Sequence, residues 1–175
     1  MGVVKKAMLG FILTLVSCSI MKDDKIGLNR LDYIDNGVRL EGYYYKELES
    51  DVPRISIYFF YRNGIALYGE APSLSNLIAH EEKFKSGQYY NRVKNNKTGW
   101  GVFQINGSAI EFEIWRPNNG GRLKTNLRSG IILNDSTFLI NSLFSNYDGQ
   151  TTVEEDTFHF KEFSPKPDST NTFIN

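Results

Sequence analysis

Two Asn-Gly pairs constrain the fold of this chain more than any other feature of its sequence. Asn63-Gly64 and Asn106-Gly107 each separate two short segments rich in aromatic and β-branched residues. An Asn-Gly pair between two such segments is the strongest short-range signal for a tight hairpin turn. Each pair therefore predicts two adjacent antiparallel strands.

The same alternation of apolar segments and turn residues continues along the chain and predicts eight strands. They are expected over residues 39–47, 54–61, 65–70, 100–105, 109–115, 122–133, 137–144 and 157–163. One helix of about a dozen residues is expected after the third strand, over 76–85, because its apolar residues approximate helical spacing and Gly87 follows as a stop signal.

Short connections between successive strands favour antiparallel pairing of neighbours. An open eight-stranded sheet would leave two edges exposed, whereas closure removes both. We therefore predict a mainly β fold, an antiparallel up-and-down eight-stranded barrel with one short helix after the third strand. A two-sheet β-sandwich satisfies the same alternation and stays the alternative.

The first residues have the order of an export signal. Lys5 and Lys6 precede the apolar run 7–16, and a small residue and the only cysteine, Cys18, follow. Positive charge, a short apolar region and a cleavage region in this order are typical of a signal peptide. The run has about ten residues, whereas a membrane-spanning helix needs roughly 20. Residues 1–17 are therefore predicted to be removed.

Leu15-Val16-Ser17-Cys18 resembles the lipobox of bacterial lipoproteins. The resemblance implies that Cys18 becomes the new N-terminus and carries the acyl chains that hold the protein on a membrane. Ser19 follows where the inner-membrane retention signal of enteric bacteria has Asp, so the comparison favours the outer membrane of a bacterial cell envelope. The periplasmic and the surface-exposed face both stay open.

The rest of the chain resembles the small lipocalin-like lipoproteins of diderm bacteria whose function is unassigned. The likeness rests on the segment Gly42-Tyr43-Tyr44-Tyr45, the paired Asn-Gly hairpins, the closing Phe158-His159-Phe160 and the Pro165-Lys166-Pro167-Asp168 that follows it. The chain departs from the usual lipocalin Gly-x-Trp, because Tyr44 stands in the place of Trp. Residues before 36 show no clean periodicity, and those after 164 are polar and rich in proline. We therefore expect a lipidated tether over 18–35, a barrel domain over 36–164 and a polar tail over 165–175 that extends outside the domain.

Composition argues against several classes of function. Lys plus Arg and Asp plus Glu number 20 each, so no net basic field favours nucleic acid. One cysteine and two histidines provide neither a disulfide framework nor a usual zinc ligand set. His80 and His159 have no nucleophile at motif spacing, and no phosphate-binding glycine loop occurs. We expect no cofactor and no enzymatic activity.

Glu111 and Glu113 are the one carboxylate pair that invites a catalytic interpretation. They lie two apart on an expected strand, so they point the same way about 6.6 Å apart, a spacing superficially suited to hydrolysis by two carboxylates. The alternative is a solvated strand face opposite Ile110, Phe112 and Ile114. A carboxylate-based hydrolase is therefore the remote alternative function.

The aromatic side chains offer a more general hypothesis. If one alternating set faces a barrel lumen and leaves space, it forms an apolar pocket with polar Tyr and Trp groups. The candidate pocket residues are Tyr43, Tyr45, Tyr58, Phe60, Trp100 and Trp115. The alternative is that these rings fill the core, as in small closed barrels.

The sequence thus predicts a non-enzymatic, lipid-anchored envelope protein. Its expected partners are a membrane, through the acyl chains, and a small apolar ligand in the lumen. The alternative is an interaction lipoprotein that docks an envelope protein.

Overall fold

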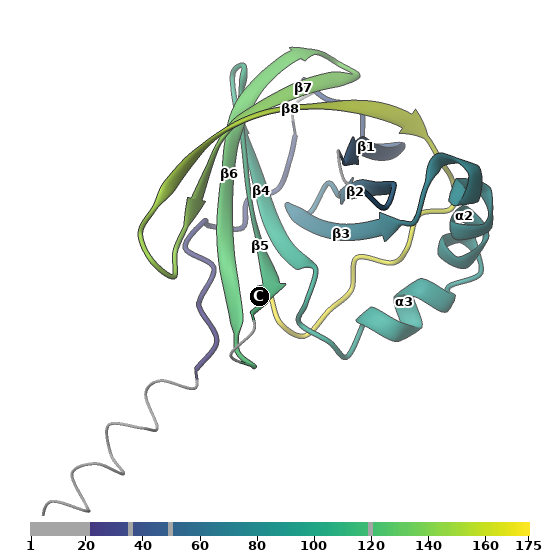
Figure 1. The fold of residues 1–175 in the computed structure, drawn as a ribbon, viewed down its shortest axis with the longest axis horizontal. Coiled ribbons are helices and arrows are strands. Elements are labelled where there is room, and N and C mark those ends of the chain that lie inside the picture. Colours follow the sequence, from purple (N-terminus) through teal and green to yellow (C-terminus); the bar gives the residue numbers. More distant parts are fainter. Residues whose placement is uncertain (1–21, 35–36, 49–50, 119–120) are drawn as a thin grey trace, which may run out of the picture.

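The computed structural model describes residues 22–34, 37–48, 51–118 and 121–175. They form a closed antiparallel barrel in which each strand pairs with its neighbours in sequence and β1 pairs with β8 (Figure 1). The strands are β1 Gly42–Leu48, β2 Arg54–Phe60, β3 Ile65–Ala71, β4 Trp100–Asn106, β5 Ala109–Pro117, β6 Leu123–Asn134, β7 Thr137–Ser145 and β8 Thr151–Glu162. The up-and-down barrel is confirmed, and the sandwich alternative is not realised. The predicted signal peptide 1–17 and Cys18 lie outside the described residues.

Both Asn-Gly hairpins form as predicted. Gly64 and Gly107 have φ angles of 74° and 59°, in the left-handed region that glycine adopts without a steric penalty. The turn at Gly64 sets the register of β2 on β3, and the turn at Gly107 sets that of β4 on β5. Local turn chemistry therefore explains the two pairings that the sequence identified most directly.

The last strand is longer than its apolar pattern indicates. It begins at Thr151 rather than at 157, and its polar first half pairs with the end of β7. Two of its carboxylates face basic side chains of other strands: Asp156 pairs with Lys46, and Glu154 lies 3.5 Å from Arg128. These ion pairs and the pairing with β7 hold a segment whose own residues have little strand preference.

The segment between β3 and β4 contains more helix than expected. A short 3₁₀ turn η1, Leu74–Asn76, leads into α2, Leu77–Lys85, which confirms the predicted helix. A further helix, α3, spans Gln88–Val93. Gly87, with φ 73°, ends α2 and starts α3 at the same residue. The six residues of α3 are too few to show helical periodicity, so the sequence did not reveal it.

The interior of the barrel is filled by aromatic rings that meet across it. Tyr58 of β2 lies 4.7 Å from Phe112 of β5, measured between ring centroids, and Phe60 of β2 lies 6.1 Å from Phe138 of β7. These strands are not neighbours in the barrel, so their contacting side chains must face inward. The inward set continues through Tyr44, Ala66, Phe103, Ile110, Ile114, Ile140 and Phe158.

The outer face of β1–β3 is also apolar, because helices and the tail cover it. Phe59 of β2 packs edge-on against Phe84 of α2 at 5.1 Å, and Phe84 packs against Tyr89 of α3 at 4.9 Å. Tyr43 of β1 lies 5.5 Å from Phe163, just after β8. Figure 1 shows α2 and α3 outside the barrel beside these strands. The molecule therefore has two apolar layers, one on each side of the β1–β3 wall.

The tail does not extend away from the domain as expected. The Nζ of Lys166 donates hydrogen bonds to the carbonyl oxygens of Leu40 and Phe60 at 2.6 and 2.9 Å, and the Tyr61 hydroxyl donates to the Pro167 carbonyl at 2.8 Å. From the end of β8 the tail runs past β3 (Figure 1). The polar composition of the tail predicts a free end. The tail instead binds the barrel, because Lys166 bonds to two buried carbonyls and Phe173 and Ile174 pack on the outer apolar layer.

The described part of the expected tether, residues 22–34, also packs on the barrel. The Asp24 amide donates to the Leu123 carbonyl at 2.9 Å, and the Trp115 indole donates to the Asp24 carbonyl at 2.8 Å. Farther on, the Tyr33 amide donates to the Arg62 carbonyl at 2.7 Å. Both segments that flank residues 36–164 therefore form part of the packed unit. In the part of the chain described, no helix has the length and apolarity needed to cross a membrane.

Candidate functional site

The structure divides the six predicted pocket residues between the two faces of the barrel wall. Tyr58 and Phe60 face the interior and are packed against other rings. The outer layer holds the rest, Tyr43, Tyr45, Trp100 and Trp115. We compare five cavities of the described residues, and Trp115 is the one residue of the six that lines any of these five, in a cavity on the outside. The six residues therefore do not form one pocket.

Glu111 and Glu113 share a face as predicted, but they do different things. Glu111 accepts a 3.1 Å hydrogen bond from Ser129. Glu113 is 1% exposed and accepts hydrogen bonds from the amides of Gly27 and Leu28, both at 2.8 Å. The face is thus not simply solvated, and the carboxylate of Glu113 is occupied in holding the N-terminal segment.

The two histidines lie apart on the outside of the barrel. His80 of α2 lines a cavity of about 290 Å³ beside α3. Burial, together with the neighbouring Lys83, lowers its pKa. His159 of β8 lies against the ring of Tyr45, with 6.3 Å between ring centroids. The structure does not bring the two histidines together.

A cavity of about 670 Å³ at one mouth of the barrel is the largest of the five. Inward-facing positions of β3, β5 and β6 provide part of its wall, and α3 with the segment leading to β4 provides the rest. It is lined by Tyr68, Glu70, Tyr89, Arg92, Val93, Asn96, Thr98, Gly99, Arg116, Pro117, Asn126 and Arg128. We call it the mouth cavity.

The mouth cavity exists because β4 starts late. Residues 66–71 of β3 pair with β2, but only residues 65–67 of β3 pair with β4. Beyond this point the Tyr68 amide donates to the Gly99 carbonyl at 2.8 Å, and no further β3–β4 register pair follows in the described residues. The ends of β3 and β5 therefore border a notch in the wall, which α3 roofs.

Ion pairs occupy most charged side chains at this end of the interior. Besides Lys46–Asp156 and Arg128–Glu154, Arg54 of β2 lies 3.3 Å from Glu70 of β3. The guanidinium of Arg116 and that of Arg92 have no ion pair within the described residues. The mouth cavity thus contains two guanidinium groups that form no ion pair within the described chain, together with the carboxylate of Glu70, which pairs with Arg54.

Both of these arginines lie against tyrosine rings. The guanidinium carbon of Arg116 is 3.5 Å from the ring centroid of Tyr68, and that of Arg92 is 5.0 Å from the centroid of Tyr89. The Tyr89 hydroxyl donates to the Tyr68 carbonyl, which joins α3 to β3. Burial raises the pKa of Tyr68 and raises that of Tyr89 to about 12, so both phenols are neutral at pH 7.

The sequence contained one signal for this cavity that the prediction did not use. Along β5 the inward positions are Ile110, Phe112 and Ile114, and the next one is Arg116. An arginine that continues an inward apolar series marks the place where a barrel interior becomes polar. Arg92 lies on α3, whose six residues show no helical periodicity.

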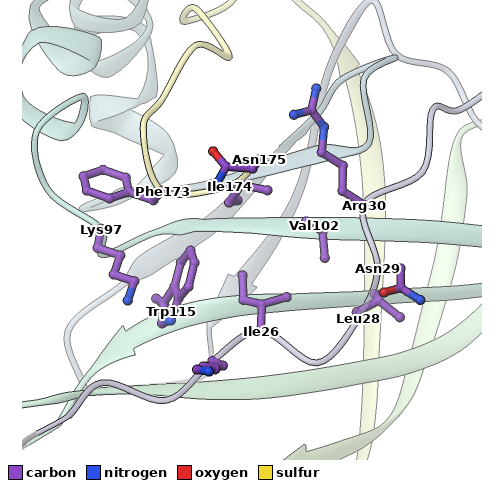
Figure 2. Close-up of a pocket in the computed structure, with 11 residues that line it drawn as sticks. Ile26, Leu28, Asn29, Arg30, Lys97, Val102, Trp115, Phe173, Ile174 and Asn175 are labelled. Carbon is purple, nitrogen blue, oxygen red and sulfur yellow. The ribbon is translucent and has the colours of Figure 1, made fainter.

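A second cavity, of about 410 Å³, lies on the outside between the N-terminal segment and the tail. Figure 2 shows the ring of Trp115 between Lys97 and Ile26, with Phe173 and Ile174 of the tail nearby. The Nζ of Lys97 is 4.4 Å from the Trp115 ring centroid and 3.3 Å from Asp23 Oδ2. This ion pair occupies the lysine, whereas Lys25 and Arg30, which also line this cavity, are exposed to solvent.

The fold and the mouth cavity together define a class of protein, a closed up-and-down β-barrel with a polar cavity at one end. Comparisons with protein-family models, curated proteins and solved structures find no match for the chain. Within the described ranges, no three His, Cys, Asp or Glu side chains gather as a metal ion would require. Function is therefore inferred from the residues of the cavity.

Proposed function

We propose that this chain is a non-enzymatic, lipid-anchored envelope protein that binds a small molecule in the mouth cavity of its barrel. The observation that carries the proposal is the cavity itself, about 670 Å³, where inward residues of three strands meet a roofing helix. Small-molecule sites typically have volumes of about 300–1,000 Å³ and favour the mouths of β-barrels.

The packing of the interior explains why the ligand sits at the mouth and not in the middle. Tyr58, Phe112 and Phe138 meet in the lumen, and none of them lines any of the five cavities. A ligand deeper in the barrel would have to displace rings that are almost completely buried. Tyr68 and Tyr89 instead line the open space of the mouth cavity.

The lipid anchor is supported by the lipobox Leu15-Val16-Ser17-Cys18 and the apolar run before it. Two or three acyl chains hold a protein on a membrane far more durably than one. Labelling of the full chain with radioactive palmitate in a diderm bacterium tests this part of the proposal. We expect Cys18→Ser to abolish the label, and an equal label on wild type and variant would refute the anchor.

Ligand binding is tested with N-phenyl-1-naphthylamine, a neutral aromatic probe whose fluorescence rises in apolar surroundings. We expect saturable binding to the folded chain, and we expect Asn126→Trp to weaken it by filling the mouth cavity. Ser108→Trp is the matched control, because Ser108 is exposed in the β4–β5 turn at the opposite mouth. Equal binding by all three proteins would show that the probe does not use this cavity.

A further inference from the structure

We infer that the ligand of the mouth cavity is an oxyanion on a planar or aromatic body, held by Arg116 with Arg92. The inference rests on the proposed function and names the chemical class of its ligand. A carboxylate, a sulfonate and a phosphate ester share the chemistry that two guanidinium groups recognise.

Arg116 is the central group. It is the last inward-facing residue of β5, one residue before the strand ends, and it is half-buried. Its guanidinium carbon lies 3.5 Å from the centroid of the Tyr68 ring. A stacked guanidinium has lost most of its freedom, so less entropy remains to be lost when an anion binds. Its planar set of donors matches the two oxygens of a carboxylate or phosphate.

The neighbouring charges make this arginine the available one. Arg128 and Arg54 also point toward this end of the barrel, but Glu154 and Glu70 neutralise them at 3.5 and 3.3 Å. Glu70 is exposed and also accepts a 3.2 Å hydrogen bond from the Tyr68 hydroxyl. Glu70 lines the same cavity and its charge also attracts Arg116, but its ion pair within the described residues is with Arg54, so the donors of Arg116 stay available to an incoming anion.

Arg92 brings a second cation from another element. It is an exposed residue of α3, and its guanidinium carbon is 5.0 Å from the centroid of the Tyr89 ring. Arg92 and Arg116 line the same cavity from its roof and from its wall. An anion between them would gain from both cations, while its aromatic body would pack in the cavity that Tyr68 and Tyr89 also line.

The test uses a matched pair of probes. 1-Anilinonaphthalene-8-sulfonate has the aromatic skeleton of N-phenyl-1-naphthylamine with a sulfonate added, so the difference between them reports the anion site. We expect Arg116→Gln to raise the dissociation constant of the sulfonate probe about tenfold or more, since a charge-assisted contact is lost. The neutral probe should bind wild type and variant within about twofold of each other.

Two further variants make the outcome specific. Arg92→Gln should weaken the sulfonate probe less than Arg116→Gln, because Arg92 is exposed. Arg62→Gln is the control, since Arg62 is exposed and pairs with Glu41 near the other mouth. Circular dichroism and the thermal midpoint confirm that each variant is folded. Added salt should weaken the sulfonate probe and leave the neutral one unchanged.

The outcomes separate the inference from the proposed function. If the neutral probe binds the cavity and Arg116→Gln leaves sulfonate affinity unchanged, the oxyanion inference is wrong while ligand binding stands. If neither probe binds the folded wild type, both fail. A loss confined to the sulfonate probe, absent in Arg62→Gln, supports the inference; titration with benzoate and phenyl phosphate as competitors then distinguishes carboxylate from phosphate.

Discussion

The carboxylate of Glu113 accepts a 2.8 Å hydrogen bond from the amide of Gly27, although 86 residues separate them in the chain. The adjacent Leu28 amide donates to the same oxygen at 2.8 Å, and the Asn146 side chain donates to the other oxygen at 2.6 Å. One buried carboxylate thus joins the N-terminal segment, β5 and the β7–β8 turn. The residue that most invited a catalytic interpretation is engaged in holding the chain together.

Glu113→Gln should therefore destabilise the protein. The substitution removes the charge that strengthens three hydrogen bonds and places an amide donor where only donors point, so we expect a loss of about 2 kcal/mol in the free energy of unfolding. Urea denaturation measures it. Trypsin should also cleave faster after Lys25 and Arg30 as the segment detaches.

Glu111→Gln is the control for this experiment. Glu111 lies on the same strand face, is only partly buried and accepts from Ser129. We expect its loss to be below about 1 kcal/mol. Equal losses for the two variants would contradict the role assigned to Glu113.

Stability should rise between pH 8 and pH 10. Burial, assisted by Arg62 and opposed by Glu41, lowers the pKa of Lys166 to about 8, from an ordinary 10.5. In this window the unfolded chain keeps a proton that the folded chain has released, so the free energy of unfolding increases with pH. Below pH 8 both states are protonated and this contribution is constant.

Above pH 10 the tyrosines reverse the trend. Burial raises the pKa of Tyr44, Tyr61 and Tyr89, so the unfolded chain ionises its phenols first and stability falls. Urea denaturation from pH 7 to 11 should show the maximum near pH 10. Lys166→Met should remove the rise, whereas Lys83→Met, an exposed lysine of α2, should keep it. If the free energy of unfolding of Lys166→Met still rose between pH 8 and pH 10, the rise would come from a group other than Lys166.

Phe138→Ala should cost about 3–5 kcal/mol, the usual range for truncating a buried phenylalanine. The ring is completely buried and stacks on Phe158 at 5.1 Å, with Tyr44 at 4.9 Å on another side. Phe144→Ala, on the same strand but only half-buried, should cost less than half as much. Guanidinium denaturation compares them, and similar costs would argue against a packed lumen.

Gly101→Ala should destabilise the barrel by about 2–3 kcal/mol through overpacking. A Cβ atom at this position would lie 2.0 Å from the carbonyl oxygen of Glu113 on the paired strand, and a backbone atom cannot rotate away. Gly37→Ala is the control, since its nearest neighbour would be a side-chain atom at 3.6 Å. Thermal unfolding of both variants measures the difference, and an unchanged midpoint for Gly101→Ala would show that the two strands can separate without cost.

The sequence was most informative where neighbours along the chain decide the structure. The glycines of the two hairpin turns, Gly64 and Gly107, set φ angles that few other residues tolerate, and the alternating segments beside them had to pair. The stop at Gly87 likewise depends on local backbone preference. From these signals the strand order and the closure of the barrel followed, because neighbours pair and open edges are unfavourable.

Local sequence patterns are thus enough to predict a set of strands and their order, together with the candidate export signal. Which ring faces the lumen was decided only by the tertiary structure, because β1–β3 are apolar on both faces: Tyr43 and Tyr44, or Phe59 and Phe60, are adjacent and both buried. Alternation indicates an inside only where one face is polar. The mouth cavity is equally nonlocal, since Arg116 and Arg92 meet only when a closed barrel receives a roof from α3.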